Sequence, residues 1–224
     1  MEKGGVKVMN SYKVKFNWII ILLLAGFWGI CASFYPSLPD QVPTHWNFQG
    51  EVDGYSHKSV TALIMPLLPL AIYILMTFTP RIDPKRQNYS KFGPSYERIR
   101  NLIVIIMVGI TLLPLLSALG YAIEVDLLIR IFIPVLFIAL GNYMGKIKHN
   151  YFIGIKVPWT LASEEVWNKT HRLGGKLMVI GGIFALTGVF APPTIGFVMV
   201  MTGILLPFLV SGVYSYLIYR KMFG

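Results

Sequence analysis

The chain has 224 residues, of which 55% are hydrophobic and only 13% are charged, and its mean hydropathy is +0.62. A soluble domain of this size does not need so much apolar surface, so the composition excludes an ordinary water-soluble protein and indicates a polytopic membrane protein. The net charge of +10 therefore reflects basic residues kept on one side of a membrane, and we expect no direct contact with nucleic acid. The single cysteine, Cys31, excludes a disulfide within the chain.

Six apolar runs follow one another, each near the roughly 20 residues that a helix needs to cross a bilayer. They cover residues 16–35, 59–78, 101–120, 127–145, 176–191 and 195–219. No small-residue cleavage site follows the first run, which predicts an uncleaved span and not a signal peptide. A barrel would show alternating strands. The predicted fold class is an all-α integral membrane protein with six transmembrane helices.

The basic residues predict the orientation. With the N-terminus in the cytoplasm, the segments on that side carry 18 of the 20 Lys and Arg residues; Lys58 lies outside and Arg130 lies within the fourth run. Both termini are thus predicted to be cytoplasmic. The basic loop 81–100 is expected to anchor this topology and to contact anionic lipids. We expect Arg130 to extend towards the interface, in preference to pairing with Asp126 four residues earlier.

The loop 36–58, predicted to be external, is rich in proline, glycine and aromatic residues, which favours turns over a long helix. Two interpretations stay open, a cap that seals the bundle at the interface and a surface that recognises something from outside. Composition alone favours the cap. The possible ligands His45, Glu51, Asp53 and His57 match no standard spacing. We therefore predict no metal and no cofactor.

The loop 146–175, predicted to be cytoplasmic, is the longest polar stretch. Pro158 interrupts any helix that precedes it. Ser163, followed by Glu164 and Glu165, predicts a new helix start, because a hydroxyl caps free amides and acids suit the positive end of the helix dipole. Trp167 and His171 would then share one face of that helix and dock it onto the bundle.

Both loops carry a distinctive motif. The first reads Pro39-x-x-Val42-Pro43-Thr44-His45-Trp46-Asn47-x-x-Gly50-x-x-Asp53-Gly54-Tyr55-x-x-Lys58. The second reads Asn150-x-x-x-Gly154-Ile155-Lys156-x-Pro158-Trp159-Thr160-Leu161-x-Ser163-x-x-x-Trp167-x-x-x-His171-x-x-Gly174-Gly175. Together, in this order on a six-span chain, they resemble the SdpI family. The resemblance implies an N-terminal membrane domain over residues 16–80 and an SdpI-like membrane domain over residues 99–221. Many members carry Arg where this chain has Lys156, which keeps a cation but not a bidentate contact.

The resemblance implies an immunity protein of the cell membrane that resists a secreted, membrane-active peptide toxin. In the best-known system the protein also senses the toxin and holds a cytoplasmic transcriptional repressor at the membrane. The implied partners are thus the toxin, a repressor and the lipid bilayer. The candidate residues for external recognition are Pro43, His45, Trp46, Asn47, Gly50, Asp53, Gly54 and Tyr55. The candidates for a cytoplasmic signalling or structural role are Asn150, Gly154, Lys156, Trp159, Thr160, Trp167 and His171.

Other function classes remain as alternatives. A small-molecule transporter is compatible with the prolines inside several spans, but no inverted repeat is visible and few ionisable residues lie at bilayer depth. A membrane stress sensor without a toxin partner is a further alternative. An intramembrane enzyme is not expected, because the chain has no His-Glu-x-x-His, no Gly-x-Ser-x-Gly and no paired intramembrane aspartates.

Overall fold

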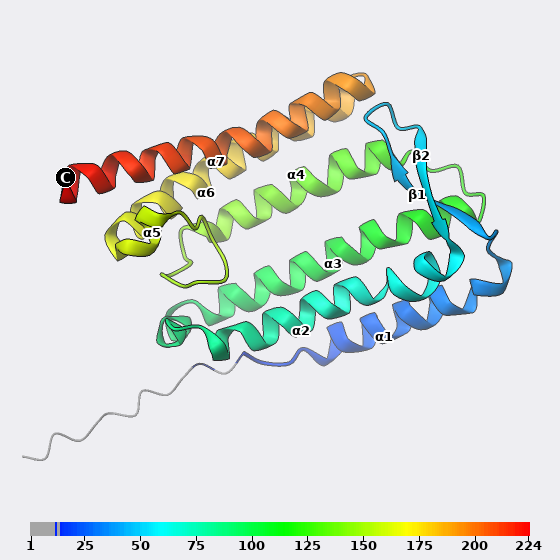
Figure 1. The fold of residues 1–224 in the computed structure, drawn as a ribbon, viewed down its shortest axis with the longest axis horizontal. Helices are drawn as coiled ribbons and strands as arrows, with labels where there is room; N and C mark the ends of the chain where they lie inside the picture. Colours follow the sequence, from blue (N-terminus) through cyan, green and yellow to red (C-terminus); the bar gives the residue numbers. More distant parts are fainter. Residues whose placement is uncertain (1–11, 13) are drawn as a thin grey trace, which may run out of the picture.

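Six long helices run side by side in an elongated bundle (Figure 1) in the computed structural model, which describes residue 12 and residues 14–224. They are α1 Trp18–Ser33, α2 Leu67–Ile82, α3 Gly93–Ala118, α4 Val125–Met144, α6 Glu164–Thr187 and α7 Pro193–Phe223. Together with adjoining short turns, each is long and apolar enough to cross a membrane. The prediction of six membrane-spanning helices is therefore confirmed.

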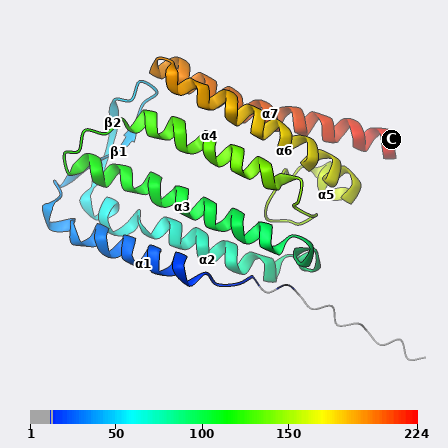
Figure 2. The ribbon, with the colours of Figure 1, turned by 180° about the vertical axis from the view of Figure 1, so that it is seen from behind.

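The short elements lie at opposite ends of this bundle. Strands β1 (Gln41–Trp46) and β2 (Val52–His57) form an antiparallel hairpin at one end, and the short helix α5 (Pro158–Ala162) lies at the other (Figures 1 and 2). We call these the hairpin end and the α5 end. The all-α prediction is wrong for the hairpin. Turn residues dominate the loop's composition and conceal the Val, Thr, Trp and Tyr residues that suit paired strands.

Two helices begin earlier than their apolar runs suggest. The predicted cap at Ser163 is confirmed, since its Oγ accepts the Val166 N–H at 3.4 Å. The helix that starts there continues unbroken into the fifth span, so α6 begins at Glu164 and not near residue 176. Similarly, α3 begins at Gly93 and not at residue 101. In both cases the first turn combines buried residues, such as Trp167 and Tyr96, with exposed or half-exposed ones, a mixture that a hydropathy threshold does not detect.

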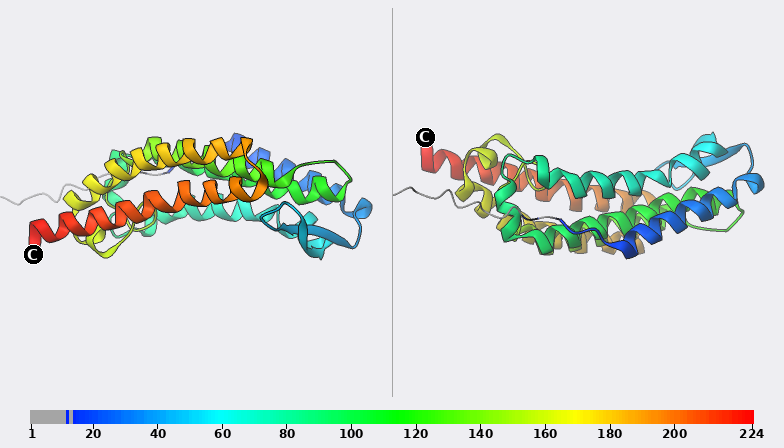
Figure 3. Two further views of the ribbon diagram at one scale, coloured as in Figure 1. Left: turned by 90° about the horizontal axis from the view of Figure 1, so that it is seen from above. Right: turned by 90° about the horizontal axis from the view of Figure 1, so that it is seen from below.

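Helices α4, α6 and α7 pack against one another, while α1 and α2 pack on α3, which joins the two groups by contacting α4 (Figure 3). Glycines allow the closest crossings. A Cβ on Gly141 of α4 would lie 2.7 Å from the carbonyl oxygen of Gly175 on α6, and one on Gly203 of α7 would clash with the carbonyl oxygen of Gly181. Larger side chains at these positions would separate the helices.

The buried apolar residues form clusters near both ends. The cluster at the hairpin end contains Phe27, Cys31, Leu38, Val42, Ala62 and Leu115. The cluster at the α5 end includes Tyr89, Phe92, Tyr96, Met144 and Trp167. Many large apolar side chains point outward instead, such as Trp18, Ile19 and Leu209. A surface of this kind is stable against lipid and not against water.

Candidate functional site

The hairpin is fastened onto the helices by its base. Val42 is fully buried and packs in the cluster that contains Phe27 and Leu115. Lys58, just after β2, donates its backbone N–H to the Asp40 carbonyl at 3.0 Å and places its ammonium 3.0 Å from the Asp40 carboxylate. The Lys58 ammonium, through this hydrogen bond, holds the pKa of the Asp40 carboxyl below its usual value. The hairpin is therefore anchored at a defined place over the bundle.

Asn47 and Gly50 shape the tip of the hairpin. The Asn47 side-chain oxygen accepts the backbone N–H groups of Gln49 at 2.9 Å and Glu51 at 3.0 Å, which closes the turn. Gly50 has a φ of +86°, a conformation that favours glycine. A Cβ there would lie 3.1 Å from the Asp126 carboxylate, so the tip rests closely against the start of α4.

His45 and Asp53 bind each other across the strands. His45 Nδ1 lies 2.5 Å from Asp53 Oδ1, and both side chains are largely exposed. Gly54 lies opposite His45, where a Cβ would come within 2.8 Å of the histidine Cβ. No group of three His, Cys, Asp or Glu side chains with metal-binding geometry occurs within residues 12 and 14–224. The exposed His45–Asp53 contact links β1 to β2.

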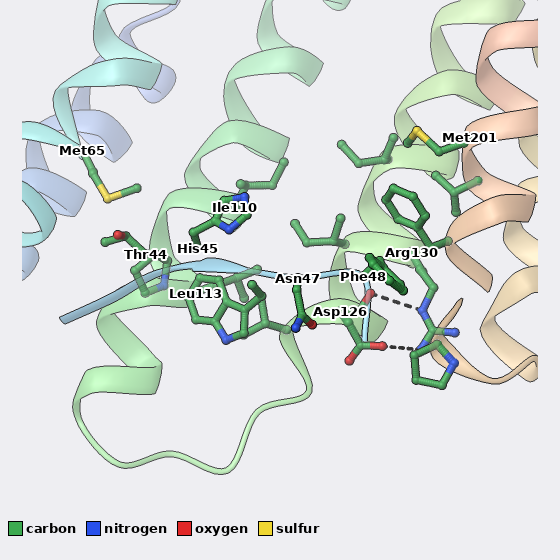
Figure 4. A pocket seen from close by; sticks show the side chains of 18 residues that line it. Thr44, His45, Asn47, Phe48, Met65, Ile110, Leu113, Asp126, Arg130 and Met201 are labelled. Carbon is green, nitrogen blue, oxygen red and sulfur yellow. Dashed lines mark hydrogen bonds and ion pairs between the residues drawn. The ribbon is translucent and has the colours of Figure 1, made fainter. Parts of the chain in front are cut away.

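A pocket of about 300 Å³ lies between the hairpin, α3, α4 and α7 (Figure 4). Thr44, His45, Trp46, Asn47 and Phe48 line it from the hairpin. Apolar side chains of the helices form most of the remaining wall, among them Ile110, Leu113, Ile129, Ile133, Phe197 and Met201. The Phe48 and Phe197 rings lie 6.2 Å apart, centre to centre. The pocket has the size and apolar character of a site for part of a ligand.

One wall of the pocket is an ion pair. Arg130 Nη2 donates to Asp126 Oδ2 at 2.5 Å, and Arg130 Nη1 donates to the carbonyl oxygens of Gly188 at 2.9 Å and Ala191 at 3.0 Å. Arg130 is only 7% exposed. The expectation that it extends to the interface is wrong, because the carbonyls of the α6–α7 connection and Asp126 together satisfy its donors. The guanidinium therefore connects α4 to that turn.

Only three of the eight candidate recognition residues line the pocket, namely His45, Trp46 and Asn47. Gly50, Asp53 and Gly54 instead take part in the turn and the strand pairing described above, and the Tyr55 side chain is 59% exposed outside the pocket. Pro43 pairs with Tyr55 in the strand register. The loop motif did not single out Phe48, Asp126 or Phe197. The Asp126–Arg130 spacing within an apolar run was the one available signal for that wall.

The second motif folds into a compact loop at the α5 end. Asn150 is fully buried; its Oδ1 accepts the N–H groups of Phe152 and Ile153, both at 2.8 Å, and its Nδ2 donates to the Lys148 and Ile153 carbonyls. Thr160 Oγ1 donates to the Ile155 carbonyl at 2.8 Å and accepts the Val157 N–H at 3.0 Å. These side chains supply hydrogen bonds that an irregular backbone segment would otherwise lack.

Trp167 and His171 hold the same loop against α6. Their rings stack with centres 3.9 Å apart. Trp167 Nε1 donates to the Ile147 carbonyl at 2.9 Å, and His171 Nε2 accepts the Ile155 N–H at 3.0 Å. His171 Nδ1 faces the Trp167 carbonyl at 2.8 Å, so the two contacts together require the neutral ring with its proton on Nδ1. Both side chains are buried, as expected for residues that dock this helix.

Three candidates of this motif remain: Gly154 lies against His171, Lys156 is exposed, and Trp159 is half-buried. The Lys156 ammonium donates a hydrogen bond to the Phe152 carbonyl at 3.0 Å, within the loop. The Trp159 ring packs on Tyr216 of α7, with centres 5.0 Å apart. The candidates from Asn150 to His171 thus form one connected structural unit.

This unit is also joined to the loop after α2, which the sequence predicted as a topology anchor and a contact for anionic lipids. Asp83 is 2% exposed, and its Oδ2 accepts the Tyr151 N–H and the Tyr89 hydroxyl, both at 3.0 Å. Burial and the neighbouring Asp83 raise the pKa of Tyr89. Asn88 Nδ2 donates to the His149 carbonyl at 2.8 Å. Neither Asp83 nor His149 was singled out from the sequence, since neither belongs to a recognisable motif.

Comparisons with known proteins agree with the two motifs. Residues 146–218 match the SdpI/YfhL protein family, and residues 20–70 match a domain of unknown function, DUF1648. A curated relative, "Immunity protein SdpI" of Bacillus subtilis (strain 168), is 30% identical over 202 residues, which is 87% of this chain and 94% of the relative. No solved structure is significantly similar.

These matches span both halves of the chain and include the hairpin and the loop against α6. With the six apolar helices they establish a multi-pass protein of the cell membrane. The chain belongs to the SdpI/YfhL protein family.

Proposed function

We propose that this chain is an immunity protein that protects its cell from a secreted, membrane-active peptide toxin. The observation that carries the proposal is the pocket of about 300 Å³ beneath the hairpin. The similarity to an immunity protein over most of the chain supports the general role. The hairpin end faces outward in the orientation that the basic residues favour. A toxin arriving from outside therefore meets this pocket first.

An apolar or aromatic side chain of the toxin enters the pocket in this proposal. Trp46 and Phe48 present aromatic surface from the hairpin, and Phe197 does so from α7. Buried aromatic anchors contribute most of the binding energy in many interfaces. The Asp126–Arg130 pair offers polar groups at one wall, which can orient a peptide bond without adding net charge.

The test is survival of a toxin-sensitive bacterium that expresses the protein and is exposed to secreted peptide toxins of the SDP type. Trp46→Ala and Phe48→Ala are expected to lower the tolerated toxin concentration about 30-fold, equivalent to losing one aromatic anchor. Tyr55→Ala is the matched control, because Tyr55 is an exposed aromatic residue of the same hairpin outside the pocket. Membrane abundance is measured for every variant.

The outcomes separate the alternatives. Protection lost in both pocket variants but kept in Tyr55→Ala supports toxin recognition in the pocket. Equal protection by all variants places recognition elsewhere on the protein. No protection by the unchanged protein against any such peptide would favour a membrane stress sensor, or a small-molecule transporter if purified protein in liposomes shows substrate flux.

A second role, holding a cytoplasmic repressor, is supported by one observation. Asp83 and Asn88 bind the loop that Trp167 and His171 hold on α6. A movement of either half of the bundle therefore displaces this loop at the α5 end. We expect toxin addition to change hydrogen exchange within residues 146–157 in the unchanged protein and not in Trp46→Ala. Identical exchange with and without bound toxin would contradict transmission.

A further inference from the structure

A charged hollow that has no part in the proposed function lies open on the surface of α6, beside Tyr214 of α7. It lies on the side of the α5 end, has a volume of about 650 Å³, and is lined by Glu165, Lys169, Arg172 and Lys176 of α6 and by Tyr214 of α7, among others. It is separate from the hairpin pocket, with which it shares no residue.

A second hollow, of about 290 Å³, continues along the same two helices and is almost wholly apolar. Leu177, Ile180 and Phe184 line it from α6, and Leu206 and Val210 line it from α7. Steps of three or four residues return to the same face of a helix. Leu173 of the charged hollow and Leu177 of the apolar hollow are therefore neighbours on α6, so the two hollows adjoin along this helix.

The charges of the first hollow do not cancel. Lys169 Nζ pairs with Glu165 Oε1 at 2.7 Å. Arg172 and Lys176 are exposed and form no ion pair within the part of the chain that the structure describes. One guanidinium and one ammonium group thus line the hollow without a carboxylate partner. A phosphate group suits this arrangement, since Arg and Lys side chains commonly donate hydrogen bonds to phosphate oxygens.

The depth of each hollow matches one part of a lipid. Tyr214 lies near Tyr216 and Tyr219 on the terminal turns of α7, and aromatic residues concentrate at the membrane–water interface. The Lys176–Phe184 segment then rises about 12 Å along α6 into apolar surroundings. The charged hollow therefore lies at headgroup level, and the apolar hollow lies at acyl-chain level directly beside it.

We propose that the α6–α7 seam is a binding site for one anionic phospholipid. Arg172 and Lys176 bind the headgroup phosphate, Tyr214 lies beside it, and an acyl chain occupies the apolar hollow against Ile180 and Leu206. Basic sites between transmembrane helices bind anionic headgroups in this way. The site lies in the leaflet at the α5 end, and it does not depend on the toxin-binding role.

The experiment measures binding of phosphatidylglycerol and phosphatidylcholine to the purified full-length protein in detergent, by native mass spectrometry. The unchanged protein is expected to retain phosphatidylglycerol in preference to phosphatidylcholine. The double variant Arg172→Gln with Lys176→Gln is expected to bind phosphatidylglycerol about 30-fold more weakly. This factor corresponds to the binding free energy that two cations at the interface contribute. The matched control is Arg220→Gln with Lys221→Gln, which removes the same charge from exposed residues at the end of α7.

Two further measurements keep the result specific. Thermal unfolding in lipid-free detergent shows whether each double variant is folded, and only folded variants are compared. Inorganic phosphate is tested as a competitor, because a lipid held by both hollows is not displaced by millimolar phosphate. Equal loss in both double variants, no preference for phosphatidylglycerol, or displacement by phosphate alone would each overturn the proposal.

Discussion

Gly154 occupies a position that no other residue fits. Its φ is +120°, and a Cβ would clash with His171 Nε2, the atom that accepts the Ile155 N–H. The backbone strain alone is about 1–3 kcal/mol, and displacing the histidine adds to it. We expect Gly154→Ala to lower the midpoint of thermal unfolding in detergent by about 5–10 °C. Gly29→Ala is the control, since a Cβ there meets nothing within 4 Å; an equal decrease in both would contradict this argument.

His149 makes stability depend on pH. The side chain is 4% exposed, its ring lies 5.1 Å from that of Trp167, and burial together with the charge of Lys85 lowers its pKa. An unfolded histidine titrates near about 6.5. Below that pH the unfolded chain binds more protons than the folded protein, so stability decreases as the pH falls from about 6.5 towards the lowered pKa.

The measurement is the unfolding midpoint between pH 7.5 and 5 for the unchanged protein and for His149→Phe. The phenylalanine keeps a ring beside Trp167 but cannot bind a proton, so its midpoint is expected to decrease less as the pH falls. His57→Phe, at an exposed position of the hairpin, is expected to keep the original slope. The same slope in all three proteins would exclude His149 as a cause.

Among the elements, the spans were predictable and the hairpin was not. Hydropathy alone located all six helices, because crossing a bilayer requires a long apolar run. Strand pairing in residues 41–57 depends on contacts such as Thr44 with Ser56 and on Val42 entering the helical core, which no local pattern encodes. For the same reason the candidate list contained Trp46 but missed Phe197, which chain folding alone brings to the pocket.

Two ion pairs with the same spacing in their helices differ in what surrounds them. Asp126–Arg130 is mostly buried and holds the α6–α7 connection, whereas Glu165–Lys169 is about half exposed on both sides. Removing one partner of a buried pair costs about 3–5 kcal/mol, and an exposed helical pair contributes about 0.3–0.5 kcal/mol. We expect Arg130→Gln to lower the unfolding midpoint clearly and Glu165→Gln to leave it nearly unchanged. Similar midpoints in both variants would show that Arg130 is not needed to join these helices.

For the whole molecule, the family motifs were informative about which segments matter but not about how they act. The motif residues from Asn150 to His171 donate and accept hydrogen bonds within their own loop. Asp83, which binds the same loop through the Tyr151 N–H, does not belong to the motif. Such partners are distant in sequence, so only the packed chain reveals that the two halves are joined at the α5 end.

Orientation is the property of the whole molecule on which toxin recognition depends. The distribution of Lys and Arg predicts that the α5 end is cytoplasmic and the hairpin end is external. The natural Cys31 is 1% exposed, so the unchanged protein serves as the unlabelled control for thiol labelling. Tyr55→Cys, on the hairpin, is expected to react with a membrane-impermeant maleimide in intact cells. Gln87→Cys, exposed in the loop after α2, is expected to react only after permeabilisation, and the opposite pattern would place the pocket on the side that an external toxin cannot reach.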